Sequence, residues 1–382
     1  MILPATYLAV LVLLVVSLFC LGTWINTFKA AGPKWGFELF SMDFSAGALI
    51  VVVIAAYTLG TLGSDLPFSD RLLVAGKTNQ VLAILSGAVF NLGNMLLLAS
   101  VSLIGISVAF PLSIGVALIV SGCFHYRADN ISYLVGGSVL ALITVVLELR
   151  AARLREAARP AQKPVLPVAA GQVNPATATV AAASRTAPLK TSSGHSHGNH
   201  SIGSQKGPEP KRMSRRSVRG ITAGLIGGIA LGFFVPILED CVPGDIGLGP
   251  YAGMLLFGIG MFASTFAYNF YFLNITIEGN ALTFASYFRG KRKQHLLGLL
   301  GGTICISGLL AATLGVQSSG SVDMPKLLSF LIPLLSIPLA VFYGAAFWKE
   351  WRVASHSRSA HLLAFVLFLC SLGLFAYGFN VH

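Results

Sequence analysis

The sequence predicts an all-α polytopic membrane protein, with about ten transmembrane helices in two inverted five-helix repeats. The first observation is composition: 55% of the residues are hydrophobic and 10% are charged, whereas an ordinary soluble domain is about 25% charged. The second is a set of ten apolar runs, each long enough for a bilayer span of about 20 residues. The third is a weak internal repeat that relates the last five runs to the first five.

The ten predicted spans are joined by short loops, except after the fifth. No basic residue precedes the first run and no small-residue cleavage site follows it, so we expect a retained span rather than a signal peptide. The predicted spans are residues 4–26, 44–63, 79–100, 103–124, 131–149, 218–238, 251–273, 295–316, 327–348 and 360–380.

A polar, basic segment at residues 151–217 divides the chain into a first five-helix repeat, 1–150, and a second, 218–382. The segment is rich in Ala, Pro, Ser, Thr and Gly and has too little apolar content to fold alone, so we expect it to be disordered. Thirteen of the 26 Lys and Arg residues lie between Arg150 and Arg219. The positive-inside rule therefore places this linker in the cytoplasm and, with ten spans, both termini outside.

The net charge of +12 does not predict a nucleic-acid partner, because half of the basic residues lie in and beside this linker and no basic groove interleaved with aromatic residues is visible. His195, His197 and His200 form a loose cluster in the linker. Their spacing is more typical of a solvated tract than of a metal site, and the five cysteines show no metal-binding spacing. We expect no metal and no cofactor.

The internal repeat appears in two stretches that occur in the same order. A Lys-x-x-Gln stretch precedes spans three and eight, at residues 77–80 and 291–294, and a glycine follows each Gln by seven residues. A Pro-Leu pair begins at Pro111 in span four and at Pro333 in span nine. A glycine lies eleven residues after each of these prolines, at Gly122 and Gly344. Because each half has an odd number of spans, the second half is inverted, as in many secondary transporters with a site near the midplane.

Two asparagines stand out in the apolar stretch FNLGNMLLL of span three. Asn91 and Asn94 lie three residues apart and so share a helix face, and an unpaired amide in hydrocarbon costs several kcal/mol. The repeat aligns them with Cys305 and Gly308, so the architecture does not require them. We interpret them as substrate contacts, with hydrogen bonding to a neighbouring helix as the close alternative.

Other polar and helix-distorting residues are weaker candidates. Trp24 and Asn26 suit a sugar, although a tryptophan near a span end is usually an interfacial anchor. Asn269 lies in the aromatic stretch YNFY, which is more typical of core or lipid packing than of a substrate wall. Glycines 220, 224, 228 and 232 predict a close helix–helix contact. The prolines expected to kink spans are Pro111, Pro333 and Pro338.

The distribution of charge indicates a neutral polar solute, because no acidic or basic residue lies in the middle of a predicted span. Glu148 is expected to reach the interface from the cytoplasmic end of span five. The candidates for binding a coupling proton or sodium ion lie near span boundaries and are Glu38, Asp43, Glu239 and Glu278.

An enzymatic function is not predicted. The stretch around Gly76, Lys77 and Thr78 lacks the first glycine that a P-loop requires, because that position is Arg71. The predicted spans show no catalytic triad and no cluster of metal-binding residues.

Four stretches of the chain resemble one transporter family: residues 22–47, 87–122, 262–272 and 347–351. They are similar to bacterial glucose/ribose-porter-type proteins of the drug/metabolite transporter superfamily, to which rhamnose–proton symporters and ureide permeases are related. The resemblance implies ten helices in two inverted halves and uptake of sugars or similar small polar solutes. The polar positions that match shared motifs are Trp24, Asn26, Glu38, Asp43, Asn91 and Asn94.

The second half departs from this family pattern. Span eight has GGTICISG where relatives carry a glycine-rich stretch with a tryptophan, and span nine is less polar than in relatives. The linker also lacks the nucleotide-binding-like motif that is frequent in ureide permeases. The resemblance therefore leaves the substrate open.

The main hypothesis is a secondary transporter that moves a small neutral polar solute, most simply a sugar, by alternating access in a bacterial inner membrane. Its partners would be the solute, a coupling proton or sodium ion, and the lipid bilayer. A ureide, nucleobase or multidrug transporter of the same superfamily is the first alternative. A membrane scaffold or sensor that acts through the central linker is an alternative of another class.

Overall fold

The computed structural model describes residues 1–125, 129–158, 214–242, 247–274, 277, 282–350 and 358–380. Its regular secondary structure is helical throughout these ranges, and ten helices or helix pairs are long and apolar enough to cross a membrane. The predicted fold class, an all-α polytopic membrane protein, is therefore confirmed. The helices are α1 Tyr7–Thr23, α2 Ile25–Ala31, α3 Phe37–Tyr57, α4 Phe68–Val74, α5 Lys77–Ile104, α6 Ile106–Phe124, α7 Ile131–Ala158, α8 Arg215–Cys241, α9 Gly249–Asn274, α10 Phe284–Phe288, α11 Arg292–Ser319, α12 Lys326–Leu334, α13 Ser336–Ala346 and α14 Arg358–Asn380, with a short 3-10 helix η1 at Gly320–Val322.

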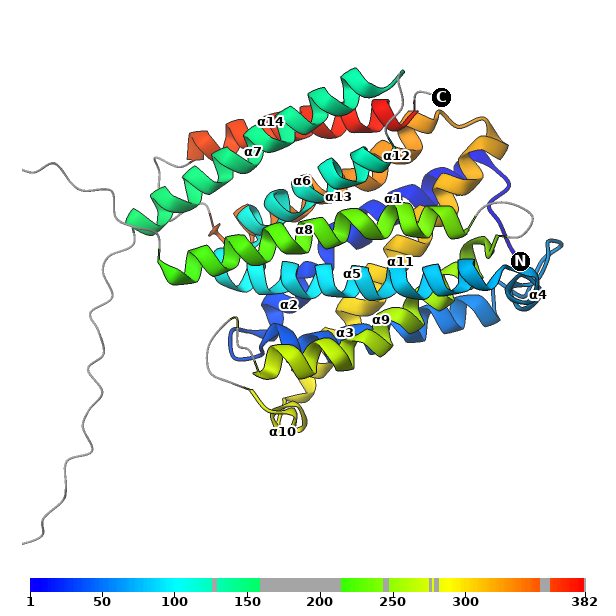
Figure 1. The fold of residues 1–382 in the computed structure, drawn as a ribbon, viewed down its shortest axis with the longest axis horizontal. Helices are drawn as coiled ribbons and strands as arrows, with labels where there is room; N and C mark the ends of the chain where they lie inside the picture. Colours follow the sequence, from blue (N-terminus) through cyan, green and yellow to red (C-terminus); the bar gives the residue numbers. More distant parts are fainter. Residues whose placement is uncertain are drawn as a thin grey trace, which may run out of the picture. The chain divides into compact units, whose positions relative to one another are not determined.

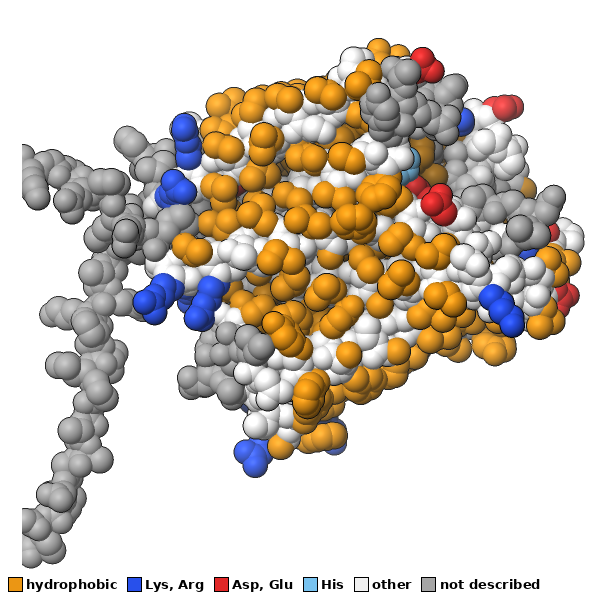
Figure 2. All heavy atoms as spheres, viewed as in Figure 1, with side chains coloured by type: hydrophobic (Ala, Val, Ile, Leu, Met, Phe, Trp, Pro, Cys, Tyr) orange, Lys and Arg blue, Asp and Glu red, His pale blue; other side chains and the backbone are white. Residues whose placement is uncertain are grey.

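The long helices form one bundle in which both chain ends lie at the same end (Figure 1). The last residues of α7 and the first of α8 lie at the opposite end. Figure 2 shows apolar side chains across the middle of the bundle, Lys and Arg side chains gathered where α7 ends and α8 begins, and acidic side chains toward the other end. We call these the linker end and the terminal end of the bundle.

Two predicted boundaries differ from the structure. The second span is Phe37–Tyr57 rather than 44–63, because Glu38 and Asp43 lower the hydropathy of its first turns although both are buried in protein. The helix of the fifth span, α7, continues through residues 151–158, which the sequence analysis assigned to the linker. The rest of the linker to residue 213, including its histidine cluster, lies outside the described residues.

The helix pairs that pack together form matched sets. The pair α3 and α11 corresponds to α9 and α5 when the first five spans are exchanged for the last five, and the pair α1 and α11 likewise corresponds to α8 and α5. The same exchange relates α6 with α8 to α13 with α1, and α6 with α7 to α12 with α14. This exchange pattern is what two structurally related five-helix halves would give, and their inversion stays a prediction of the sequence repeat.

The crossing of α3 with α11 and the crossing of α9 with α5 are built in the same way. A Cβ atom on Gly302 would collide with the carbonyl oxygen of Phe44, and one on Gly47 would collide with that of Leu299. In the other crossing, Gly87 meets the carbonyl oxygen of Phe257, and Gly260 meets that of Ile84. Each crossing therefore brings two helix backbones into direct contact through two glycines.

These contacts place Gly87 in correspondence with Gly302, whereas the sequence repeat aligned it with Gly301. The structural register differs by one residue, and it makes Ile306 and Leu309 the counterparts of Asn91 and Asn94. Both counterparts are apolar, so the packing of the bundle does not require the two amides.

The glycine ridge of α8 makes the close helix contact that its spacing predicts. A Cβ atom on Gly228 would collide with the carbonyl oxygen of Ser113 on α6, and Gly224 and Gly232 lie against Leu112 and Val120 of the same helix. The structural role expected for this ridge is confirmed.

Two spans are interrupted. The first breaks at Trp24, between α1 and α2. The ninth breaks at Leu335, between α12 and α13, with Pro333 before the break and Pro338 after it. Proline cannot donate a backbone hydrogen bond and so favours such an interruption. Pro111, in contrast, lies inside the uninterrupted helix α6.

The backbone contact at Gly302 leads to a stability prediction. We expect Gly302→Ala to lower the free energy of unfolding by about 1–3 kcal/mol, because the added methyl group must displace the backbone of α3. The control is Gly373→Ala, since no atom lies within 4 Å of a Cβ at Gly373 on α14. This control should be neutral or stabilising by up to about 1 kcal/mol. Thermal unfolding of both variants in detergent measures the difference, and equal stability would contradict the crossing.

Candidate functional site

A cavity of about 360 Å³ runs into the bundle between helices of both halves. At the terminal end its lining includes the exposed residues Glu239 and Gln317. At its inner end it is lined by the buried residues Trp24, Asn94 and Cys305. The cavity is therefore open toward the terminal end and closed toward the linker end.

The cavity wall is mainly apolar. Aromatic rings come from α5, α6, α8, α12 and α14 in addition to Trp24, and leucine, isoleucine and valine side chains fill most of the remaining wall. Polar side chains are few. They are Asn94, Ser121, His125, Glu239, Thr313, Gln317, Ser329 and Ser336. Such a wall suits a ligand with much apolar surface and a small number of polar groups.

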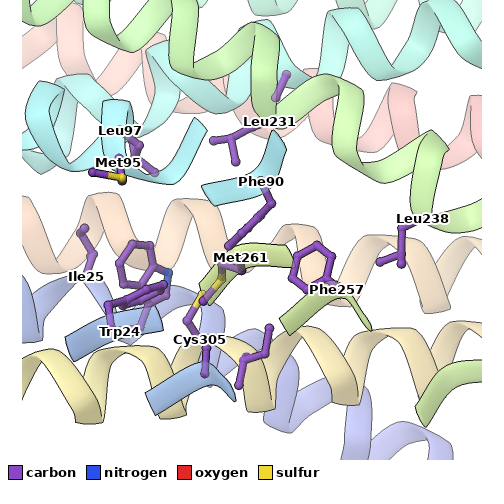
Figure 3. Close-up of a cluster of buried hydrophobic side chains, with 14 of the residues drawn as sticks. Trp24, Ile25, Phe90, Met95, Leu97, Leu231, Leu238, Phe257, Met261 and Cys305 are labelled. Carbon is purple, nitrogen blue, oxygen red and sulfur yellow. The ribbon is translucent and has the colours of Figure 1, made fainter. Parts of the chain in front are cut away.

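The breaks in the first and ninth spans both reach the cavity. Trp24 lies at the junction of α1 and α2, and its ring centroid is 5.1 Å from that of Phe44 and 6.5 Å from that of Phe110. Only 4% of Trp24 is exposed, so it is not the interfacial anchor that its position in the sequence favoured. Figure 3 shows its side chain in the middle of the bundle with Phe90 and Cys305, which also line the cavity.

Asn94 supplies an amide to the inner end of the cavity. It is 1% exposed, and its Nδ2 finds no hydrogen-bond partner among the described residues. An unpartnered amide N–H in an apolar setting carries a desolvation penalty of about 1–3 kcal/mol. A ligand acceptor placed at this end of the cavity would remove that penalty.

Asn91 lies in the contact between α5 and α9 and is not part of the cavity wall. Its Nδ2 lies 3.0 Å from the carbonyl oxygen of Met261, 2.9 Å from Ser264 Oγ and 3.0 Å from Thr265 Oγ1. These contacts correspond to the interhelical hydrogen bonding that was the alternative interpretation of this residue.

The other two candidate asparagines also lie away from the cavity wall. Asn26 accepts a hydrogen bond of 2.8 Å from Trp348 Nε1 and donates one of 2.9 Å to the carbonyl oxygen of Thr23. Asn269 is fully buried on α9, and neither of its amide atoms has a partner within the described part of the chain. It lies between the Asn91 contact of α9 and the contact of Phe272 with Phe37.

An ionic cluster lies at the linker end of the bundle, beyond the closed end of the cavity. Glu350 accepts three hydrogen bonds. They come from Lys29 Nζ on α2 at 2.7 Å, from the backbone N–H of Ile106 at 3.0 Å and from that of Ser107 at 2.8 Å. Its carboxylate thus caps the N-terminus of α6, a position that favours an anion. Gly105 precedes this helix with φ 91°, a conformation that favours glycine.

We call this cluster, formed by Lys29, Glu350 and the start of α6, the latch. It joins the first half of the chain to the second. Burial raises the pKa of Glu350, but the charge of Lys29 and the hydrogen bonds from Lys29 and Ser107 outweigh it and leave this pKa below its usual value. The carboxylate is therefore charged at neutral pH.

Glu239, a candidate for ion coupling, lies at the mouth of the cavity. Its carboxylate is 2.7 Å from Nε2 of His125, the residue that follows α6. This hydrogen bond raises the pKa of His125 above its usual value, although burial opposes it. Sequence reasoning did not identify His125.

Two of the remaining acidic candidates, Glu38 and Asp43, do not line the cavity. Glu38 is buried in the first turn of α3, and Asp43 contacts Tyr287 and His295. Glu278 lies outside the described residues.

Glu148 does not extend to the membrane interface as expected. It is 2% exposed, and its carboxylate is 2.9 Å from Nδ1 of the fully buried His361. This pair joins α7 to α14. The sequence could not reveal it, because the two residues are 213 positions apart.

Comparison with known proteins gives one partial similarity. A stretch of 123 residues, 31% of the chain, is 24% identical to Ureide permease 4 of Arabidopsis thaliana, and the match spans 30% of that protein. No protein-family model matches the chain, and no solved structure matches it. The similarity is consistent with the relationship to ureide permeases that the sequence motifs suggested, and it does not extend to a sugar porter.

The contacts of Asn91 lead to a prediction about stability. Asn91→Ala should lower the free energy of unfolding by about 0.6–2 kcal/mol, because it removes hydrogen bonds between two membrane helices. Thermal unfolding in detergent provides the measurement. Asn94→Ala is the matched control and should unfold no more easily than the unmodified chain, since Asn94 Nδ2 has no partner to lose.

The latch leads to a prediction about pH. Because the folded pKa of Glu350 is lowered, its stabilising contribution is present above the unfolded value of about 4.3 and is lost as the pH falls through the folded value. Glu350→Gln should therefore unfold at a lower temperature than the unmodified chain at neutral pH. The difference should shrink as the pH falls below about 4. A difference that is independent of pH would contradict a charged latch.

Proposed function

We propose that this chain is a secondary transporter that moves a small, mostly uncharged solute across the membrane by alternating access. The ten-span architecture and the partial similarity to a permease support a membrane transporter. The observation that carries the proposal is a cavity that is open at one end of the bundle and closed at the other, where Asn94 Nδ2 has no partner in the described part of the chain. Such a cavity can hold a solute but does not form a continuous pore.

The latch is the element that closes the second exit. In the proposed cycle, a solute enters from the terminal end and binds near Trp24 and Asn94. Rocking of the two halves then separates Lys29 from Glu350 and opens the linker end. The interrupted helices at Trp24 and Leu335 lie at the cavity and give the backbone places at which to bend.

The wall of the cavity favours a flat heterocyclic amide, such as a ureide or nucleobase, over a sugar. A sugar carries several hydroxyl groups, and each group left unpaired in an apolar cavity costs about 1–3 kcal/mol. A flat ring can instead pack on the indole of Trp24 while its carbonyl oxygen accepts from Asn94 Nδ2. The partially similar plant protein is named Ureide permease 4, and this name supports the same choice.

The proposed orientation places the linker end of the bundle in the cytoplasm, because Lys and Arg side chains gather there (Figure 2). The chain halves 1–150 and 218–382 would then be inverted repeats, with both termini outside. In the bacterial inner membrane suggested by the sequence motifs, the structure would be in its outward-open state. No catalytic role is part of this proposal.

Uptake by proteoliposomes tests the function. Purified chain is reconstituted, and the entry of labelled allantoin, uracil and glucose is followed with and without an inward proton gradient. We expect saturable uptake of allantoin or uracil that exceeds uptake by empty liposomes. Saturable glucose uptake alone would restore the sugar hypothesis, and no uptake of any of the three would contradict the proposed substrate class.

Asn94 provides the residue-level prediction. Asn94→Ala should raise the concentration needed for half-maximal uptake by about 2- to 10-fold, the value of one neutral hydrogen bond, without loss of folded protein. The control is Asn274→Ala, since Asn274 lies exposed at the end of α9 and, among the described residues, donates only to the carbonyl oxygen of Phe270. Equal half-saturation for both variants and the unmodified chain would exclude Asn94 from the site.

A further inference from the structure

A cluster of ionisable side chains lies beside the cavity floor, at the linker end of α3 and α11. Asp43 accepts a hydrogen bond of 2.5 Å from the hydroxyl of Tyr287 and lies 2.9 Å from Nδ1 of His295. The Asp43 side chain is 8% exposed and that of His295 is 28% exposed. A carboxylate at this depth is thus paired with an imidazole, a side chain that can bind a second proton.

The imidazole of His295 makes its hydrogen bonds among the described residues through Nδ1, to the two carboxylate oxygens of Asp43. While Nδ1 faces Asp43, Nε2 lies against Gly290, where a Cβ atom would come within 2.5 Å of it. The rings of Trp35 and Tyr287 pack edge-on against the imidazole at 5.0 Å and 4.7 Å. Burial and the hydrogen bond to Asp43 raise the pKa of Tyr287, so its hydroxyl stays protonated and donates.

The same helix crossing exists elsewhere in the bundle without these groups. When α9 and α5 are matched to α3 and α11 through their glycine contacts, Leu256 takes the place of Asp43 and Gln80 takes the place of His295. Continuing the α5–α11 match to the short helix before each of them pairs Leu72 on α4 with Tyr287 on α10. Gln80 Nε2 donates a hydrogen bond of 2.8 Å to the carbonyl oxygen of Leu72. The α5–α9 crossing thus packs in the same way with uncharged residues at these places. Packing alone therefore does not explain why the α3–α11 crossing contains an acid and an imidazole.

We propose that Asp43, Tyr287 and His295 form the proton-binding site of this transporter. The proton binds to the lone pair of Nε2, while Nδ1–H continues to donate to Asp43, so that the imidazolium is paired with the carboxylate. Release of the proton returns a neutral imidazole and leaves the carboxylate held by Tyr287. The coupling role of the site rests on the transport function proposed above, whereas proton binding itself does not.

The position of the cluster connects it to both the cavity and the latch. Phe44, the neighbour of Asp43, packs on the ring of Trp24 at the cavity floor. Phe40, on the same helix, packs on Phe28 of α2, and α2 carries Lys29 of the latch. A change in charge at Asp43 and His295 therefore acts on the contact of α3 and α11 with the helix that closes the linker end.

Other charged groups near the cluster are already paired or face solvent. Lys29 on α2 binds Glu350, and Glu38 lies buried in the first turn of α3. The tyrosines of α9 lie elsewhere, since Tyr268 donates to the carbonyl oxygen of Ala88 and Tyr271 is exposed. The basic groups around the loop before α3 and the start of α11 are exposed, and these are Lys34, Arg289, Lys291, Arg292 and Lys293.

The first test needs no substrate. The full chain in lipid nanodiscs is titrated between about pH 5 and about pH 8, where histidine changes charge, and tryptophan emission is recorded. Trp35→Phe identifies the part of the signal that comes from Trp35. We expect that part to fall reversibly on acidification, because an imidazolium quenches an indole in contact with it. It should not change with pH in His295→Gln, which keeps a side-chain donor for Asp43.

His125→Gln is the control for the titration, since His125 also pairs with a carboxylate but lies at the cavity mouth. Its Trp35 signal should retain the pH dependence. A Trp35 emission that does not change with pH, or that still changes in His295→Gln, would overturn the proton site, whether or not the chain transports any tested solute.

The second test addresses coupling in proteoliposomes with labelled allantoin or uracil. Asp43→Asn and His295→Gln should retain exchange of labelled for unlabelled solute at equal pH and lose the accumulation that an inward proton gradient drives. Gradient-driven accumulation as large as in the unmodified chain would overturn the coupling role. Loss of exchange as well as accumulation in both variants would also overturn it, because the cluster would then be a structural tie.

Discussion

The close contact of helix backbones at glycine is the constraint on which the rest of the structure depends. At the crossings of α3 with α11 and of α5 with α9, a carbonyl oxygen of one helix occupies the place that a Cβ atom would take on the other. Lipid supplies no hydrophobic force between helices, so such tight packing must hold them together. It also fixes the register of the helices, and with it the side chains that reach the cavity.

Because backbone packing holds the crossings, not every buried polar side chain is needed to join helices. Asn91 ties α5 to α9, whereas Asn94, less than one helical turn later, lies at the cavity with its N–H groups unpartnered among the described residues. The same contrast exists between the two crossings. One contains leucines and a glutamine, and the other contains Asp43, Tyr287 and His295. The two halves share their packing and differ in their chemistry.

The two ends of the bundle also differ in what joins them. At the linker end, the latch joins α2, the start of α6 and Glu350 through three hydrogen bonds of 2.7–3.0 Å. At the terminal end, His125 and Glu239 pair on two helices that are already packed together, and the cavity between the halves stays open. A structure closed at one end and open at the other is what the proposed alternating-access cycle requires of one of its states.

The sequence by itself determined the fold class, the number of spans and the glycine ridge of α8, because apolar runs and small-residue spacing act locally along the chain. It also indicated Trp24 and Asn94, which the structure places at the inner end of the cavity. Only the tertiary structure decided that Asn91 binds α9, that Asn26 binds Trp348, that Glu148 pairs with His361, and that Lys29 reaches Glu350. Each of these contacts joins residues more than 150 positions apart, and the direction of a side chain across such a distance depends on how the helices pack.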